Sequence, residues 1–227
     1  AVQAVVAVRG SGLDPAALEL IDAAHCRLLR ETEGVDLIDY PTVFMEFHVA
    51  MPEALDSVLE SVKAICEEYE AVRIHTATDP AERKRLWHAR HHSYEIMVRS
   101  APDKKIFIND VAVPISAYPA LIASIEQIKA EMGIQAMMIG HAGDGNIHVE
   151  FPFGSAAEYA QVIEANGRIV TRAIELGGTA TGEHGVGIGK AKYLPMEHGE
   201  GLDVMRAIKQ TLDPNGILNP GKIFLED

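Results

Sequence analysis

Two histidines flank a short polar turn in an otherwise apolar segment, GHAGDGNIHVEF at residues 140–151. An Asp-Gly pair between two apolar runs is typical of a two-residue type I′ β-hairpin, because both central residues need a positive φ. If Asp144 and Gly145 are those residues, His141 lies directly opposite His148 on the same face of the sheet. Two imidazoles at that spacing could ligate one divalent metal ion. Taken alone, the hairpin favours the alternative, an exposed turn whose histidines have no joint role.

A second segment, GGTATGEHGVGIGK at residues 177–190, surrounds a glutamate and a histidine with six glycines. Its glycines follow the pattern GxGxG, whereas a dinucleotide-binding loop needs GxGxxG directly after a strand. The segment also lacks the first glycine of a P-loop, and Ala191 stands where a P-loop has Ser or Thr. The pattern argues against a nucleotide loop. It leaves a plain flexible loop, or a loop whose backbone approaches a ligand closely.

The second of these alternatives gives the glutamate and the histidine a chemical role. The Glu183 carboxylate would complete a two-histidine, one-carboxylate ligand set with His141 and His148, which leaves coordination positions open for a substrate. His184 would remain free to accept a proton near neutral pH. The sequence does not establish that the loop reaches the hairpin, so the joint site is a hypothesis.

The composition limits the class of protein. The chain has 227 residues, of which 48% are hydrophobic and 23% charged, as in an ordinary globular domain. A net charge of −13, without any cluster of Lys and Arg, argues against a nucleic-acid partner. Cys26 and Cys66 lie in apolar helical patterns without CxxC spacing, so we expect two buried thiols and a reducing compartment.

The termini and the hydropathy pattern bear on location and completeness. No segment has the roughly 18 consecutive apolar residues of a membrane span. The chain begins inside a helical pattern, without Met and without the pattern of a signal peptide. We therefore expect a piece of a longer protein that is cytoplasmic, with peripheral association with the inner membrane as the alternative.

Hydrophobic periodicity predicts a mixture of helices and short strands in one continuous domain. The expected helices span residues 1–9, 14–31, 52–69, 80–100, 115–132, 155–176 and 200–212. The expected strands span residues 42–51, 71–78, 107–113, 135–142 and 146–151. Short strands and a hairpin favour an α+β fold with an antiparallel or mixed sheet over a doubly wound parallel sheet.

Five motifs occur in order along the chain: LWHARHHSYE, NDVAVPISAYP, GHAGDGNIH, GGTATGEHGVGIGKAKYL and LDPNGILNPGKIF. From about residue 14 to the end, the chain resembles the C-terminal domain of the FAD-linked oxidases. It is similar in particular to cytochrome-type D-lactate dehydrogenases, glycolate oxidase FAD subunits and D-2-hydroxyglutarate dehydrogenases. The resemblance implies one domain over residues 1–227, a ferredoxin-like cap with a mostly antiparallel sheet, flanking helices and a helical C-terminal tail. It also implies an N-terminal FAD-binding domain, absent from this chain, as a partner.

The resemblance assigns roles to individual residues. It implies a divalent metal, Zn²⁺ or Mn²⁺, at the positions of His141, His148 and Glu183. His184 matches the catalytic base of the family. Arg90 in LWHAR matches the arginine that binds the substrate carboxylate, and Asn219 in LNPGK matches an asparagine near the flavin ring. Without the resemblance, Arg90 is most simply a cation on a helix surface.

These assignments imply oxidation of a small 2-hydroxy acid, such as D-lactate or glycolate, to the 2-oxo acid by hydride transfer to FAD. The electron acceptor is left open, and a homodimer is an alternative to a monomer. Ile108 and Glu150 replace a lysine and an asparagine of the 2-hydroxyglutarate enzymes, which argues for a monoacid, although Lys104 and Lys105 are close. A catalytically silent metal-binding or subunit-interaction domain is the principal alternative, and a metal-dependent hydrolase is a weaker one.

Three further features have simpler interpretations. His88 and His92 have the HxxxH spacing of a zinc helix but lack the glutamate of HExxH, so a solvated helix face is favoured. Trp87 is expected in the core or at an interface. Asp110 could support the site or bond at a strand end, and the sequence does not decide.

Overall fold

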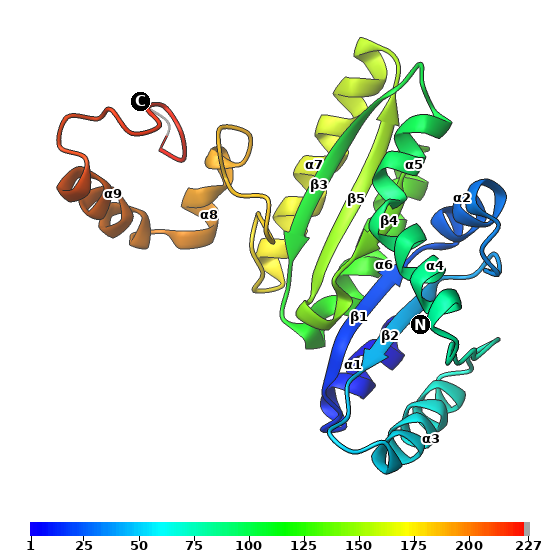
Figure 1. The fold of residues 1–227 in the computed structure, drawn as a ribbon. Helices are drawn as coiled ribbons and strands as arrows, with labels where there is room; N and C mark the ends of the chain where they lie inside the picture. The colour runs from blue at the N-terminus through cyan, green and yellow to red at the C-terminus, as the bar shows by residue number, and fades with distance from the viewer. Residues whose placement is uncertain (225–227) are drawn as a thin grey trace.

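The computed structural model describes residues 1–224, and within them the strands form a single five-stranded sheet in the order β2-β1-β4-β5-β3 (Figure 1). Every pairing in this sheet is antiparallel. The strands are β1 (Pro15–Ile21), β2 (Thr42–Phe47), β3 (Lys105–Ala112), β4 (Met137–Gly140) and β5 (Asn146–Phe153). The expected α+β fold with a mostly antiparallel sheet is confirmed.

The helices account for most of the rest of the chain. They are α1 (Val2–Gly10), α2 (Ala23–Glu33), α3 (Glu53–Glu68), α4 (Pro80–His91), α5 (Ser93–Ser100), α6 (Tyr118–Met132), α7 (Ala156–Glu175), α8 (Leu194–His198) and α9 (Gly201–Leu212). Local chemistry explains several of the boundaries. Ser155 and Glu158 form a capping box at the start of α7, and Gly133 in the left-handed conformation ends α6. No helix of the described residues is long and apolar enough to cross a membrane.

Helices cover both faces of the sheet. On one face α6 and α7 lie side by side and pack, with α1, against apolar side chains of β3 and β5 such as Val149 and Phe151. On the other face α2, α4 and α5 form a smaller core around Ile21 of β1 and Ile139 of β4. Helices α8 and α9 lie beside the sheet as a C-terminal tail (Figure 1), which agrees with the expected helical tail. The polar residues of interest lie on the face of the smaller core.

The segment predicted as one helix over residues 14–31 is a strand followed by a helix. Residues 18–21 of β1 are all buried, because this strand has a neighbour on each side and packing on both faces. A strand buried on both faces shows no polar alternation, so its sequence imitates a helical pattern. The side chain of Asp22 then accepts the N–H of His25 and begins α2.

Two other predicted elements also differ. Residues 71–78 were expected as a strand, but they form an exposed irregular segment in which Arg73 pairs with Asp36. The strand predicted over residues 42–51 ends earlier, at Phe47. The single helix predicted over residues 80–100 is divided at His92, so that α4 and α5 run in different directions (Figure 1).

The hairpin is longer than the predicted two-residue turn. Ile139, not His141, pairs with His148, and a 3₁₀ turn at Ala142–Asp144 connects the strands. Gly145 has the left-handed conformation, and a Cβ there would lie 1.9 Å from the carbonyl oxygen of Val113. The register differs from the expected one by two residues. A shift of two preserves the side-chain alternation of a strand, whereas a shift of one would have reversed it.

Candidate metal and substrate site

The carboxylate of Glu183 lies between the two histidines of the hairpin. Its Oε1 is 3.0 Å from His148 Nε2 and 3.5 Å from His141 Nε2. Three donor atoms, one from each residue, lie within 4.8 Å of one another. Ligand atoms about 2.0–2.1 Å from a tetrahedral zinc ion are about 3.3 Å apart, so the spacing and the N, N, O donor set fit such a divalent ion. The structure thus brings together the three residues that the sequence proposed as ligands.

A carboxylate lies behind each histidine. His148 lies on β5, where Asp110 of β3 is its cross-strand partner and places Oδ1 3.5 Å from His148 Nδ1. Burial lowers the pKa of His148, although Asp110 opposes the shift, and this favours the neutral imidazole that binds metals. His141 directs Nδ1 at Glu19, 2.7 Å from Oε1. This hydrogen bond raises the pKa of His141.

Asp110 also holds the loop that carries Glu183 and His184. Its Oδ2 accepts the backbone N–H groups of both residues, at 3.0 and 2.9 Å, and its Oδ1 accepts Asn146 Nδ2 at 2.7 Å. Burial raises the pKa of Asp110, but the hydrogen bonds outweigh it and the net shift is strongly downward. Lys190 donates to the backbone carbonyl of Asp110 from the far end of the same loop. Asp110 therefore has the supporting role that the sequence left open.

The glycines of this loop allow it to approach the sheet. A Cβ on Gly182 would lie 2.0 Å from Asn146 Nδ2 and 2.6 Å from Asp110 Oδ1. A Cβ on Gly178 would lie 2.2 Å from the carbonyl oxygen of Ala112. These contacts argue against the first of the two alternatives for this segment, a plain flexible loop. The close approach is to strand β3 and to the side chain of Asn146 at the start of β5.

His184 lies beside the three possible ligands, and with Asp110 and His148 it forms a second group of three donor atoms within 4.8 Å of one another. Its ring is stacked on that of His148, with centroids 4.7 Å apart and planes inclined by 5°. Its Nε2 is 3.8 Å from Glu183 Oε1, and 46% of its side chain is exposed. The imidazole can therefore meet a molecule bound next to the three donor atoms.

The other two predicted site residues have different outcomes. Arg90, in the last turn of α4, is buried and donates from Nη2 to Glu19 Oε2, which connects it to His141 through one carboxylate. Asn219 follows α9 with a positive φ of 47°. Among the described residues no hydrogen bond or ion pair joins Asn219 to the histidines, so this chain alone does not bring it to the site.

Two residues around the site escaped sequence reasoning. Glu19 was assigned to a helix that does not exist, and its signal was a single carboxylate within the apolar run LELI. Asn146 bonds to Asp110 and to the carbonyl of Val111 from the first position of β5. It is the polar residue that directly follows the predicted turn, where a side-chain amide can bond to neighbouring strands.

The remaining candidates do not join the cluster. His88 and His92 stack with centroids 4.1 Å apart, but no third ligand lies with them among the described residues. Trp87 is half-buried and packs between Phe44 and His91. Cys26 is buried as predicted, whereas Cys66 is only half-buried.

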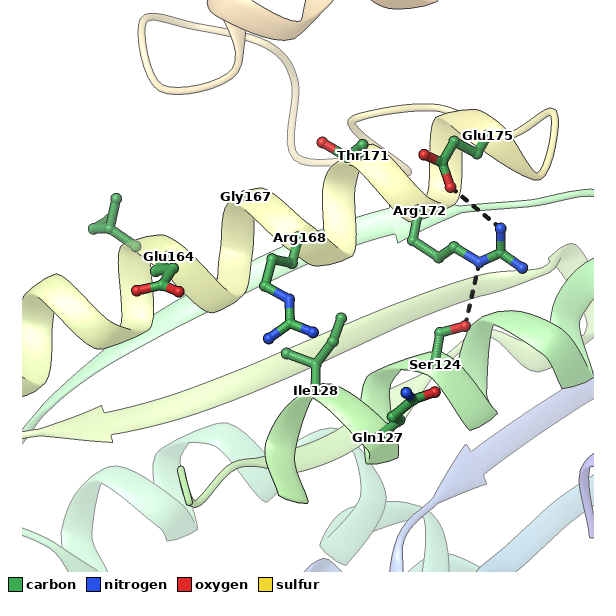
Figure 2. Close-up of a pocket in the computed structure, with 10 residues that line it drawn as sticks. Ser124, Gln127, Ile128, Glu164, Gly167, Arg168, Thr171, Arg172 and Glu175 are labelled. Atoms are coloured by element: carbon green, nitrogen blue, oxygen red, sulfur yellow. Dashed lines mark hydrogen bonds and ion pairs between the residues drawn. The ribbon is translucent and has the colours of Figure 1, made fainter. Parts of the chain in front are cut away.

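Two hollows occur on the described surface. The wider one is an open groove between α6 and α7, where Arg172 bonds to Ser124 and Glu175 (Figure 2). None of the site residues lines it. A smaller and more polar pocket adjoins His141 and Glu19, with Arg9 and Asp144 at its wall. Neither His148 nor Glu183 lines this pocket, so it adjoins the candidate site only on the side of His141 and Glu19.

Known proteins share the sequence over nearly all of this chain. A family model described as "FAD linked oxidases, C-terminal domain" matches residues 1–223. The mitochondrial D-lactate dehydrogenase (cytochrome) 1 of Saccharomyces cerevisiae is 35% identical over 225 residues, 96% of this chain and 38% of that protein. The glycolate oxidase subunit GlcD of Bacillus subtilis is 35% identical over 231 residues, 100% of this chain and 49% of that protein. The chain thus spans less than half the length of these relatives.

Solved structures share the fold. 4-Ethylphenol oxidase from Gulosibacter chungangensis superposes with a TM-score of 0.66 at 15% identity, covering 99% of this chain and 50% of that one. p-Cresol methylhydroxylase superposes with a TM-score of 0.65 at 12% identity, with the same two coverages. At these identities the likeness concerns the architecture alone.

Proposed function

Because the chain belongs to the family of the FAD-linked oxidases, as their C-terminal domain, we propose that it is the substrate- and metal-binding portion of a flavin-dependent 2-hydroxy-acid dehydrogenase. The family makes it part of an oxidoreductase that uses FAD. The observation that carries the finer proposal is the Glu183 carboxylate between His141 and His148, with His184 stacked beside them.

His141, His148 and Glu183 would hold the metal, Zn²⁺ or Mn²⁺. When bound, such an ion lowers the pKa of a coordinated hydroxyl group and orients the molecule that carries it. Two neutral imidazoles and one carboxylate leave positions open for this purpose. The lowered pKa of His148 supports the proposal, because it favours the neutral imidazole that binds a metal ion.

His184 would accept the hydroxyl proton of the substrate, because its ring is exposed and adjacent to the proposed ligands. Arg90 would bind the substrate carboxylate: its Nη2 is taken by Glu19, but its Nε is buried without an acceptor. Oxidation removes one proton and one hydride from the 2-hydroxy acid. The proton would go to His184, and FAD, when bound, would supply the acceptor of the hydride from the α-carbon.

The flavin would be held mainly by an N-terminal FAD-binding domain, which we propose as the partner of this chain. Asn219 would approach the flavin ring only when that domain is present. The relatives' names, D-lactate dehydrogenase and glycolate oxidase, favour a small monoacid substrate. Glu150 agrees, since a buried carboxylate two residues beyond His148 on the same strand face disfavours a second anionic group nearby. We propose a cytoplasmic location, while the mitochondrial relatives keep association with the inner membrane open.

The test is turnover with the metal content measured alongside it. The protein, combined with its flavin-binding domain and loaded with Mn²⁺ or Zn²⁺, should reduce an artificial dye acceptor when D-lactate or glycolate is added. His184→Ala should lower kcat by about 10²–10⁴-fold, the usual contribution of a general base, while the metal content stays unchanged. His198→Ala, in α8, is the matched control and should keep full turnover. A loaded, flavin-bound protein that oxidises no 2-hydroxy acid would support the silent metal-binding alternative.

A further inference from the structure

One buried carboxylate connects the proposed metal ligands to the proposed substrate arginine. Glu19 is 8% exposed, and its two oxygens have different partners. Oε1 lies 2.7 Å from His141 Nδ1, and Oε2 accepts Arg90 Nη2. Neither oxygen of this buried carboxylate is left without a partner.

The sheet register fixes this arrangement. Leu20 of β1 pairs with Gly140 of β4, so the antiparallel register continues with Glu19 opposite His141. Glu19 also pairs with Phe44 of β2, and α4 packs over that side of the sheet through Trp87. The guanidinium at the end of α4 thereby arrives at a strand position that already faces the hairpin.

The contact of Glu19 determines which nitrogen of His141 is free. A carboxylate accepts only from a protonated Nδ1, so in the neutral ring Nε2 keeps its lone pair, and this atom lies 3.5 Å from Glu183 Oε1. The same carboxylate occupies only one edge of the Arg90 guanidinium. The Nε edge of that guanidinium is buried and has no acceptor.

We propose that Glu19 is a positioning residue that serves both halves of the site: it directs His141 Nε2 to the metal and turns the Nε edge of Arg90 to the substrate carboxylate. This inference rests on the metal site of the proposed function. It adds that the metal ligand and the substrate arginine are held by a single anion. Removing that anion should therefore affect metal binding and substrate binding together.

Glu19→Gln is the sharpest variant, because glutamine has the same size but only one acceptor oxygen. If the amide oxygen accepts from His141 Nδ1, the amide NH₂ group faces Arg90 Nη2, which is also a donor. In the reverse orientation the NH₂ group faces the N–H of His141. Loss of such a supporting carboxylate weakens metal affinity by about 10–100-fold. KM for the 2-hydroxy acid should rise as well, even at saturating metal, because Arg90 loses its anchor.

The experiment titrates the metal-free protein with Mn²⁺ and measures Kd for wild type, Glu19→Gln and Glu46→Gln, with circular dichroism as the folding check. Glu46 lies on the neighbouring strand β2. Among the described residues its carboxylate bonds only to the exposed His48, so the Glu46→Gln variant should match wild type. A folded Glu19→Gln protein whose Kd lies within threefold of wild type would overturn the inference. Wild type that binds no Mn²⁺ or Zn²⁺ would overturn the proposed metal site itself.

A second measurement needs no variant. In the Zn²⁺-loaded wild type, ¹⁵N-resolved NMR of the histidine rings should show His141 ligated through Nε2, with a hydrogen-bonded proton on Nδ1. Ligation through Nδ1 would contradict the role of Glu19 even if the variant does not fold. Kinetics of the flavin-loaded protein complete the test: an unchanged KM at saturating metal would exclude the part of the inference that concerns Arg90.

Discussion

At the scale of single residues, the candidate site is organised by carboxylates that are not themselves the proposed ligands. Asp110 and Glu19 lie behind His148 and His141, and each is buried and multiply bonded. The hydrogen bond between Glu19 and His141 is charge-assisted and fixes that ring more tightly than a neutral contact would, whereas Asp110 lies 3.5 Å from His148 Nδ1 without a hydrogen bond to it. A site with this support can keep its geometry before any ion binds. The sequence indicated the proposed ligands because histidines near glycines are conspicuous. It left the supporting role of Asp110 undecided and gave no indication of that of Glu19.

Asp110→Asn should release the loop that carries Glu183 and His184. The asparagine keeps one acceptor oxygen, but its NH₂ group faces N–H donors, and Lys190 loses the nearby anion. We expect a loss of about 1–3 kcal/mol in the free energy of unfolding, together with weaker Mn²⁺ binding. Denaturant unfolding and metal titration measure the two effects.

The control for this variant is Asp39→Asn, an exposed carboxylate paired with Arg30 at 2.6 Å, which should lower the free energy of unfolding much less than Asp110→Asn does. The pKa of Asp110 lies below its unfolded value, so its contribution is complete above about pH 5 and is lost as the pH falls. As the pH is lowered, the free energy of unfolding of Asp110→Asn should therefore fall less steeply than that of wild type. Equal stability of the two variants would contradict the role assigned to Asp110.

At the scale of elements, sequence patterns predicted most helices but misplaced the strand that matters most. The apolar periodicity and end signals of α3, α6 and α7 gave their extents closely. Strand β1 was missed because a strand with two neighbours and two covered faces has no alternation to detect. The register of the hairpin depended on a turn type that Asp-Gly only favours. Since Glu19 lies on β1, that one misassignment also hid its contact with His141.

A substitution in the loop of residues 177–190 tests whether its glycines are needed for the close approach to the sheet. In Gly182→Ala the new methyl group would meet Asn146 and Asp110, so the backbone must move and take Glu183 with it. We expect Mn²⁺ affinity to fall at least about tenfold, as for other losses of ligand support. Gly189→Ala is the matched control, because a Cβ there meets nothing within 4 Å. Equal Mn²⁺ affinities, measured by titration, would show that the close approach is not needed.

At the scale of the whole molecule, an ion at this site would join the β4–β5 hairpin to the loop that follows α7. His141 follows β4, His148 lies within β5, and Glu183 comes from the loop after α7, some 35 residues beyond (Figure 1). Anything that binds only the folded state stabilises it, by about 2.7 kcal/mol when the free concentration is 100 times Kd. For a domain of this size, each kcal/mol raises Tm by about 2–4 °C. Excess Mn²⁺ or Zn²⁺ should therefore raise Tm by about 5–10 °C, and a chelator should reverse the change.

The thermal shift should depend on both the ligand set and the pH. Glu183→Gln should remove most of it, while the Tm of the metal-free variant stays close to that of wild type, because this carboxylate is about half exposed. The hydrogen bond with Glu19 raises the pKa of His141, so protons compete with the metal increasingly as the pH falls. The metal-dependent part of Tm should accordingly be largest at neutral pH and shrink on acidification, as scanning calorimetry at several pH values can measure. An equal shift in Glu183→Gln, or one that grows towards acid, would mean that the ion binds elsewhere on the protein.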